Sequence, residues 1–126
     1  YIQTASGNTT VPTAMVKIRQ GEEVLEGAGT GDGPVDAACQ TIKSLVGIPV
    51  QLVYFTISSL TGGLDALGEV VITLEDEITK HRATGRGHNT DVIVASALAY
   101  VDALNRLEFM KEKTVHPQEA PKSEAP

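Results

Sequence analysis

Two glycine-rich segments, each directly before a helical pattern, contain the residues of this sequence best suited to bind a small molecule. The first is GDGP at residues 31–34, before a helix expected at 34–46, and the second spans residues 85–91, before a helix expected at about 90–110. A helix start exposes unpaired N–H groups and carries a partial positive charge, and glycine lets other groups approach the backbone closely. Both segments therefore predict an anion site, with Thr90 as the N-cap of the second helix.

The carboxylate of a small molecule fits these segments better than a phosphate does. Dinucleotide-binding loops use G-x-G-x-x-G after a parallel strand, whereas the glycines at 29, 31 and 33 are spaced G-x-G-x-G, and no Gly-Lys-Ser/Thr loop is present. Asp32 and Asp36 could pair with an ammonium group, which favours a zwitterionic amino acid as the ligand. The alternative is that the glycines only turn a strand tightly into a helix and that Asp32 caps this helix.

No set of residues has the spacing of a catalytic or metal site. Asp32 and Asp36 are one helical turn apart, which is more typical of first-turn charges than of an acid–base pair. His88 and Asp91 lack a third metal ligand at a recognisable spacing. Cys39 is the only cysteine, and we expect it to be a small buried residue in a protein of a reducing compartment. We therefore expect neither a metal nor a cofactor in this segment.

The elements that must position these residues repeat once along the chain. An offset of 56 places the Gly-x-Gly at residues 29–31 on the one at 85–87. The sequence therefore predicts an α+β fold of two pseudo-symmetric β-β-β-α units, with antiparallel sheets and two helices. Strands are expected at residues 1–6, 12–19 and 23–28 in the first unit and at residues 50–60, 68–74 and 78–84 in the second.

Length and composition indicate one domain followed by a tail. A chain of 126 residues, 41% of them hydrophobic, can form one core. We expect this domain over residues 1–110, with the repeat at about 1–47 and 50–110. Residues 111–126 are mainly Pro, Glu, Lys and Ala, which predicts a disordered extension. The chain begins with Tyr1 rather than Met, which favours a piece of a longer protein.

Charge and hydropathy argue against nucleic acids and membranes as partners. The formal net charge of -6 leaves no basic face for phosphates. No apolar stretch approaches the roughly 18 residues of a membrane span. We expect a cytoplasmic protein that binds neither.

Several motifs, in order along the chain, resemble the C-terminal regulatory domain of 2-isopropylmalate synthases, which some citramalate synthases share. They are GDGPVDA at residues 31–37, GRGHNTDVIVAS at 85–96 and AYVDALNR at 99–106. The resemblance covers about residues 1–107 and implies the same duplicated fold. It also implies a role in feedback inhibition, in which the domain forms a homodimer and binds leucine near the dimer interface.

The resemblance further implies that this segment alone is not an enzyme. Family members are acyltransferases in which a separate TIM barrel condenses acetyl-CoA with a 2-oxo acid, using a divalent metal, and the motifs of that barrel do not occur here. The implied partners are that barrel, a second copy of the chain and leucine. Three alternatives stay open: isoleucine as the effector of a citramalate synthase, a dimerisation module without a ligand, and a small independent enzyme.

Together with the helix starts, the resemblance suggests which residues surround the amino acid. The two helix starts would hold its carboxylate, Asp32 and Asp36 would face its ammonium group, and apolar residues would surround its side chain. Leucine would then stiffen or reorient the domain relative to the barrel. The candidate ligand-binding residues are Gly31, Asp32, Gly33, Pro34, Val35, Asp36, Ala37, Leu52, Tyr54, Ser58, Ala66, Asn89, Thr90, Asp91 and Ile93.

Overall fold

Two three-stranded sheets, each followed by a helix, make up the part of the chain that the computed structural model describes, which is residues 1–5, 11–59 and 67–119. Both sheets are antiparallel, with the strand orders β1-β2-β3 and β4-β5-β6. The predicted α+β fold of two β-β-β-α units is therefore confirmed. The elements are β1 (Ile2–Ala5), β2 (Thr13–Gln20), β3 (Glu23–Thr30), α1 (Pro34–Val46), β4 (Val50–Ser59), β5 (Gly68–Asp76), β6 (Arg82–Asn89) and α2 (Val92–Glu119).

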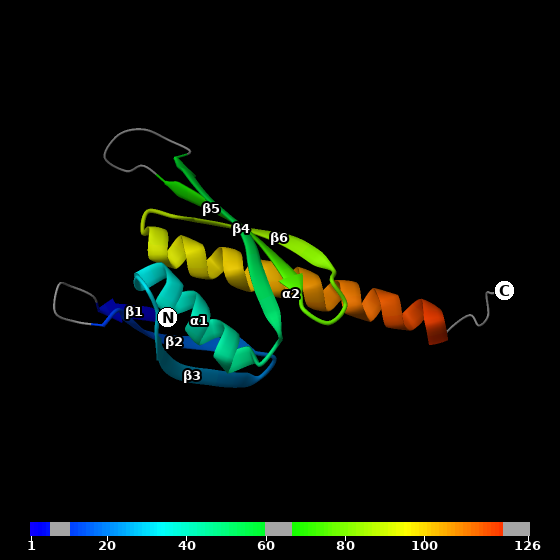
Figure 1. Cartoon of the computed structure of the whole chain (residues 1–126). Helices are drawn as coiled ribbons and strands as arrows, with labels where there is room; N and C mark the ends of the chain where they lie inside the picture. Colours follow the sequence, from blue (N-terminus) through cyan, green and yellow to red (C-terminus); the bar gives the residue numbers. More distant parts are fainter. Residues whose placement is uncertain (6–10, 60–66, 120–126) are drawn as a thin grey trace.

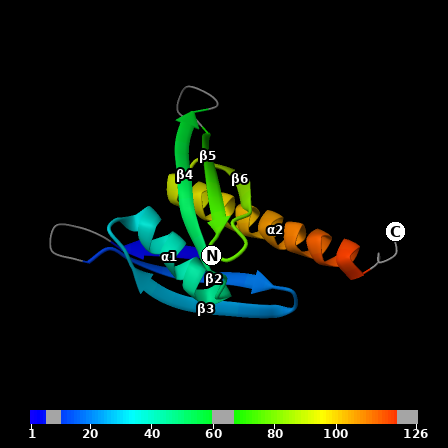
Figure 2. The same cartoon turned by 45° about the vertical axis from the view of Figure 1, so that its right-hand side comes forward.

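Each helix packs on its own sheet and on the other helix. α1 contacts β2 and β3, α2 contacts β5 and β6, and the two helices contact each other, so that they lie between the sheets (Figure 1). Figures 1 and 2 both show the two helices beginning at the same end of the molecule. This arrangement brings the two candidate helix starts to one side. The largest fully buried apolar side chains are Val16, Ile42, Val50, Val70, Ile72, Leu74 and Leu107.

Glycines that the sequence suggested as loop residues belong to strands. Gly29 lies in β3, and Gly85 and Gly87 lie in β6. None of them has a positive φ. A Cβ added to Gly85 would collide with the backbone of Ala99 and Ala103, and one added to Gly87 would lie 2.8 Å from the backbone nitrogen of Ala99. The prediction of a turn at these glycines is therefore wrong, and they instead let α2 lie directly against β6.

Two corresponding glycines of the first unit face side chains of α1 rather than its backbone, and they show the true offset of the repeat. In β3, an added Cβ on Gly27 would lie 2.8 Å from the side chain of Leu45, and one on Gly29 would lie 2.6 Å from Oγ1 of Thr41. The two helices begin 58 positions apart, and the same offset places these two glycines on the two glycines of β6. The offset of 56 holds for β2 and β5 but is wrong from β3 onward, because the connection between β5 and β6 is longer than the turn between β2 and β3.

α2 continues to Glu119, past residue 110 where the sequence suggested its end. Nζ of Lys111 lies 2.9 Å from Oδ2 of the buried Asp76 and 3.4 Å from Oε2 of Glu108. This ion pair ties α2 to the end of β5 at Lys111, and a disordered extension over residues 111–126 stays a prediction. Residues 120–126 lie outside the described part of the chain.

Asp76 also fixes the turn between β5 and β6. Its Oδ1 accepts hydrogen bonds from the N–H groups of Ile78, at 2.8 Å, and Thr79, at 3.0 Å. The return strand therefore begins at Arg82 rather than at Ile78 as predicted. The hydrogen bond from Thr79, together with the contact to Lys111, lowers the pKa of Asp76 to about 2.

Replacing Gly85 by alanine should lower the free energy of unfolding by about 1–3 kcal/mol, because the new methyl group meets helix backbone that cannot move aside cheaply. Urea denaturation followed by circular dichroism measures this change. Gly68→Ala is the matched control, since its added Cβ would lie 3.5 Å from the carbonyl oxygen of Asn89, an ordinary contact. Equal losses in both variants would contradict the close approach of α2 and β6.

Replacing Asp76 by asparagine should lower the free energy of unfolding at pH 7 by about 1–3 kcal/mol, because Lys111 loses its buried partner. The pKa of Asp76 is lower in the folded chain than the usual 3.8 of an aspartate, so its contribution to stability is complete above about pH 4 and is lost as the pH falls toward 2. The variant should therefore lose less stability than the wild type between pH 4 and pH 2 in urea denaturation.

Glu77→Gln is the control for this experiment, because its exposed pair with Lys43 spans 3.9 Å and such pairs contribute little. It should leave both the stability at pH 7 and its decline in acid nearly unchanged. An unchanged acid profile in Asp76→Asn would refute the role of Asp76.

Candidate functional site

α1 begins without a side-chain cap. Its N-cap is Gly33, in extended backbone with a φ of -160°, and Pro34 occupies the first helical position. Oδ2 of Asp36 accepts a hydrogen bond from the N–H of Asp32 at 2.9 Å, and a Cβ on Gly31 would lie 2.5 Å from the same oxygen. One interpretation of the sequence was that Asp32 caps α1, and this is wrong because the helix has no side-chain cap. The positive end of α1 can still receive an anion from outside the chain.

The start of α2 is capped by the carboxylate of Asp91. Oδ1 of Asp91 accepts a hydrogen bond from the N–H of Ile93 at 2.9 Å, and Oδ1 of Asn89 accepts one from the N–H of Asp91 at 2.9 Å. The N–H of Ala95 donates to the carbonyl oxygen of Asp91, so the N-cap is Asp91 and the prediction of Thr90 is wrong. Asp91 thus occupies the cap position of α2, whereas the carboxylate of Asp36 near the start of α1 bonds to the N–H of Asp32 and leaves the cap position of α1 without a side chain.

The candidates on β4 lie on opposite faces of their sheet. A bulge between Leu52 and Tyr54 shifts the register of β4 against β5. Leu52 pairs with the buried Leu74 and faces the helices, whereas Tyr54 and Ser58 pair with polar residues on the outer face. The strand therefore does not bring these three candidates together.

The bulge instead turns two unpredicted residues toward the helices. Phe55 pairs with Ile72, and Ile57 pairs with Val70. Their partners Ile72 and Val70 are fully buried in the core. A simple alternation along residues 52–58 puts 52, 54, 56 and 58 on one face, and nothing in the sequence of this apolar strand marks the extra residue. The sequence therefore contains no signal that places Phe55 and Ile57 on the face toward the helices.

A cavity of about 250 Å³ between α1 and the beginning of β4 brings Asp36 and Leu52 together. Its lining also includes Cys39, Lys43 and Tyr100. Asp36 and Lys43 are two helical turns apart, which is about 10 Å along α1. The lining thus includes one acidic and one basic side chain from the same helix.

The other candidates take part in packing or lie elsewhere. Ala37 is fully buried in the core. Val35 and Ile93 are half-buried against the core, and Ala66 lies outside the described residues. Of the predicted apolar candidates, Leu52 alone lines the cavity.

Burial controls the ionisation of the groups in this cavity. Burial first, and then the charge of Asp36, raises the pKa of Cys39 to about 12. Burial, followed by the effect of Cys39, raises the pKa of Tyr100 above its usual value. Both groups are neutral near pH 7, so Cys39 is the inert buried residue that the sequence predicted rather than a nucleophile. Asp36 and Lys43 carry the charges of the cavity.

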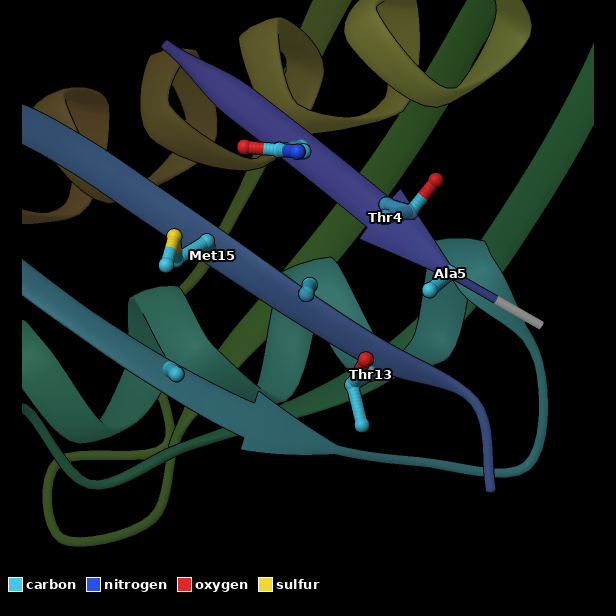
Figure 3. A pocket seen from close by; sticks show the side chains of 7 residues that line it. Thr4, Ala5, Thr13 and Met15 are labelled. Atoms are coloured by element: carbon cyan, nitrogen blue, oxygen red, sulfur yellow. The ribbon is translucent and has the colours of Figure 1, made fainter. Parts of the chain in front are cut away.

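Another hollow, of about 210 Å³, runs along β1, β2 and β3 and is lined partly by Thr4, Ala5, Thr13 and Met15 (Figure 3). The described residues that line it include no charged residue and none of the candidates. It therefore offers less to a zwitterion than the cavity beside Asp36 does.

The histidines and acidic residues of the described ranges do not assemble a metal site. His88 Nε2 lies 3.1 Å from Oε2 of Glu69, rather than pairing with Asp91. Among the residues that the structure describes, no three His, Cys, Asp or Glu side chains gather as metal ligands would. None of the described helices is long and apolar enough to cross a membrane.

Comparison with known proteins adds independent information. The family model described as the LeuA allosteric (dimerisation) domain matches residues 1–108. A 2-isopropylmalate synthase of Heliobacterium modesticaldum is 47% identical over 109 residues, which cover 86% of this chain and 21% of that protein. The corresponding synthase of Syntrophus aciditrophicus is 41% identical over 111 residues, covering 88% and 21%. That of Prochlorococcus marinus subsp. pastoris is 40% identical over 121 residues, covering 94% and 22%.

The chain thus spans about a fifth of the length of these relatives. The matched range includes both β-β-β-α units and both helix starts. The chain belongs to the family of LeuA allosteric (dimerisation) domains, the regulatory domain of 2-isopropylmalate synthase.

Proposed function

We propose that this chain is the leucine-sensing part of a 2-isopropylmalate synthase and inhibits that enzyme when leucine accumulates. The observation that supports this most is the family match over residues 1–108, to a domain described as allosteric. The condensation of acetyl-CoA with a 2-oxo acid, and the divalent metal that assists it, would belong to the catalytic barrel of the same chain. The domain would act as a cytoplasmic homodimer and contribute regulation rather than chemistry.

The uncapped start of α1 is the best receptor for the carboxylate of leucine. The N-cap of α1 is Gly33, which has no side chain, whereas Asp91 already fills the same position in α2. Asp36 lies in the first turn of α1 and lines the cavity, where its carboxylate can face the ammonium group. This assignment revises the expectation that both helix starts hold the carboxylate.

The apolar side chain of leucine would extend from that point toward β4. Leu52 and Tyr100 line the cavity, and Cys39 beside them is neutral. Burying a leucine side chain contributes about 1.5–3 kcal/mol. A pocket of this kind distinguishes leucine from valine by about 1–3 kcal/mol for the missing methylene. That difference is sufficient for feedback control by the correct amino acid.

Binding would inhibit by shifting an equilibrium between two arrangements of the domain and the barrel. A coupling free energy of about 1–3 kcal/mol is enough for such regulation. The site lies between α1 of the first unit and β4 of the second, so a ligand there would contact both units. Leucine would thereby stiffen the connection between them.

Titration calorimetry with leucine, isoleucine and valine tests the choice of effector. We expect leucine to bind most tightly, because it fills the apolar part of the cavity without the branch at Cβ. Tighter binding of isoleucine would assign the chain to a citramalate synthase. Absence of heat with all three amino acids, confirmed by equilibrium dialysis with labelled leucine, would leave a dimerisation module without a ligand.

Gly33→Asp tests the carboxylate site without damaging the fold. The extended backbone at this N-cap accepts any residue, and no atom lies within 4 Å of an added Cβ. The new carboxylate should cap α1 and raise the free energy of unfolding by about 0.3 kcal/mol. Leucine binding should become at least about tenfold weaker through repulsion of its carboxylate.

Gly33→Ala is the matched control, because it adds the Cβ without the charge and should retain leucine binding. Calorimetry measures affinity and thermal unfolding measures stability. Undiminished leucine affinity in Gly33→Asp would show that the carboxylate lies elsewhere.

A further inference from the structure

β4 exposes large apolar side chains on both faces. Leu52 is 41% exposed and Ile57 47% on the helix-facing side, and Tyr54 is 53% exposed on the outer side. Val53, in the bulge between them, is 37% exposed. We call these four residues the β4 patch. β4 is the first strand in the order β4-β5-β6, and α2 packs on β5 and β6, so the helix leaves this edge of the sheet bare.

The other long strands carry charges that the β4 patch lacks. β4 has the sequence VQLVYFTISS, ten residues without a charge. β3, at an edge of the first sheet, contains Glu23 and Glu26, and β6, at the far edge of the second, contains Arg82 and Arg86. Charged side chains on edge strands prevent other chains from pairing with them.

The edge of β6 is also occupied by its own helix. Oδ2 of Asp102 accepts a hydrogen bond from the backbone N–H of Arg86 at 3.0 Å and lies 3.2 Å from Nε of Arg106. An edge amide satisfied in this way is not available to a strand from another chain. β1, the remaining edge strand, has only four residues. Within the part of the chain that the structure describes, β4 is therefore the long edge strand that neither charged side chains nor a helix protects.

We propose that the β4 patch is the surface through which two copies of this chain associate. The proposal rests on the dimerisation role of the family and names the surface that performs it. Each copy carries a formal net charge of -6, so two copies repel each other, and a contact surface without charges avoids bringing like charges close together. In a two-fold dimer the same patch meets itself, and an apolar patch is complementary to itself whereas an acidic one is not.

The position of the patch determines how the partner must approach. Ile57 and Tyr54 are exposed on opposite faces of the sheet, so the partner contacts both sides only if it reaches over the free edge of β4. Leu52 belongs to the patch and also lines the cavity beside Asp36. The two copies therefore meet next to the candidate leucine site.

Sedimentation equilibrium of this chain and its variants tests the proposal. Ile57→Asp places a charge in the patch without altering a residue of the candidate cavity, and it should weaken dimerisation about 30-fold or more, as expected of a central interface residue. Val24→Asp is the matched control: Val24 is 53% exposed in β3, and this variant should remain as dimeric as the wild type. Circular dichroism and thermal unfolding verify that each variant is folded.

A second substitution keeps the test valid if Ile57→Asp proves unstable. Tyr54→Arg changes the outer face only, where the side chain is 53% exposed, and should also produce monomers. A dimeric wild type with dimeric Ile57→Asp and Tyr54→Arg would overturn the assignment of the surface but not the dimer. A wild type that is monomeric at high concentration would overturn both, whereas the leucine titration would still decide the sensing function.

Discussion

The rest of this domain depends on a contact between helix and strand that leaves no room for a side chain. Gly85 and Gly87 lie under the backbone of α2, at Ala95, Ala99 and Ala103. These alanines are four residues apart, so one face of the helix is flat along its length and can lie against the flat strand. Glycine is required here by the space between the elements, not by an unusual backbone angle. A helix held this closely has a fixed direction, and its first turn therefore has a fixed position.

Both units pack a helix against glycines of their third strand, but the two helices begin differently. In the second unit Asp91 closes the start of α2 with its own carboxylate, whereas in the first unit Gly33 leaves the start of α1 without a side-chain cap. Asp36 lies beside that start and bonds back to the loop. The duplicated fold thus has one helix start capped by an acidic side chain and one without a side-chain cap.

The sequence predicted more of the fold than of the site. The apolar periodicity of the strands and helices and the helix stop at Gly47, whose φ is 69°, are local properties, and all of them are present in the structure. Gly31, Gly33 and Asp36 were also identified at the start of α1, because glycine, proline and an early acidic residue mark a helix start. The prediction that Leu52, Tyr54 and Ser58 share one face of β4 was wrong. The bulge between Leu52 and Tyr54 moves every later residue of the strand to the opposite face of the sheet.

The sequence by itself determined the order of the elements, the duplication and the family, because these follow from local patterns and motifs. Only the tertiary structure decided that the glycines belong to strands, that Asp91 caps α2, and that Phe55 and Ile57 face the helices. It also decided that α2 extends past Met110, through the pairing of Lys111 with a buried carboxylate of a distant strand. Each of these depends on contacts between residues far apart in the chain, which no short stretch of sequence contains.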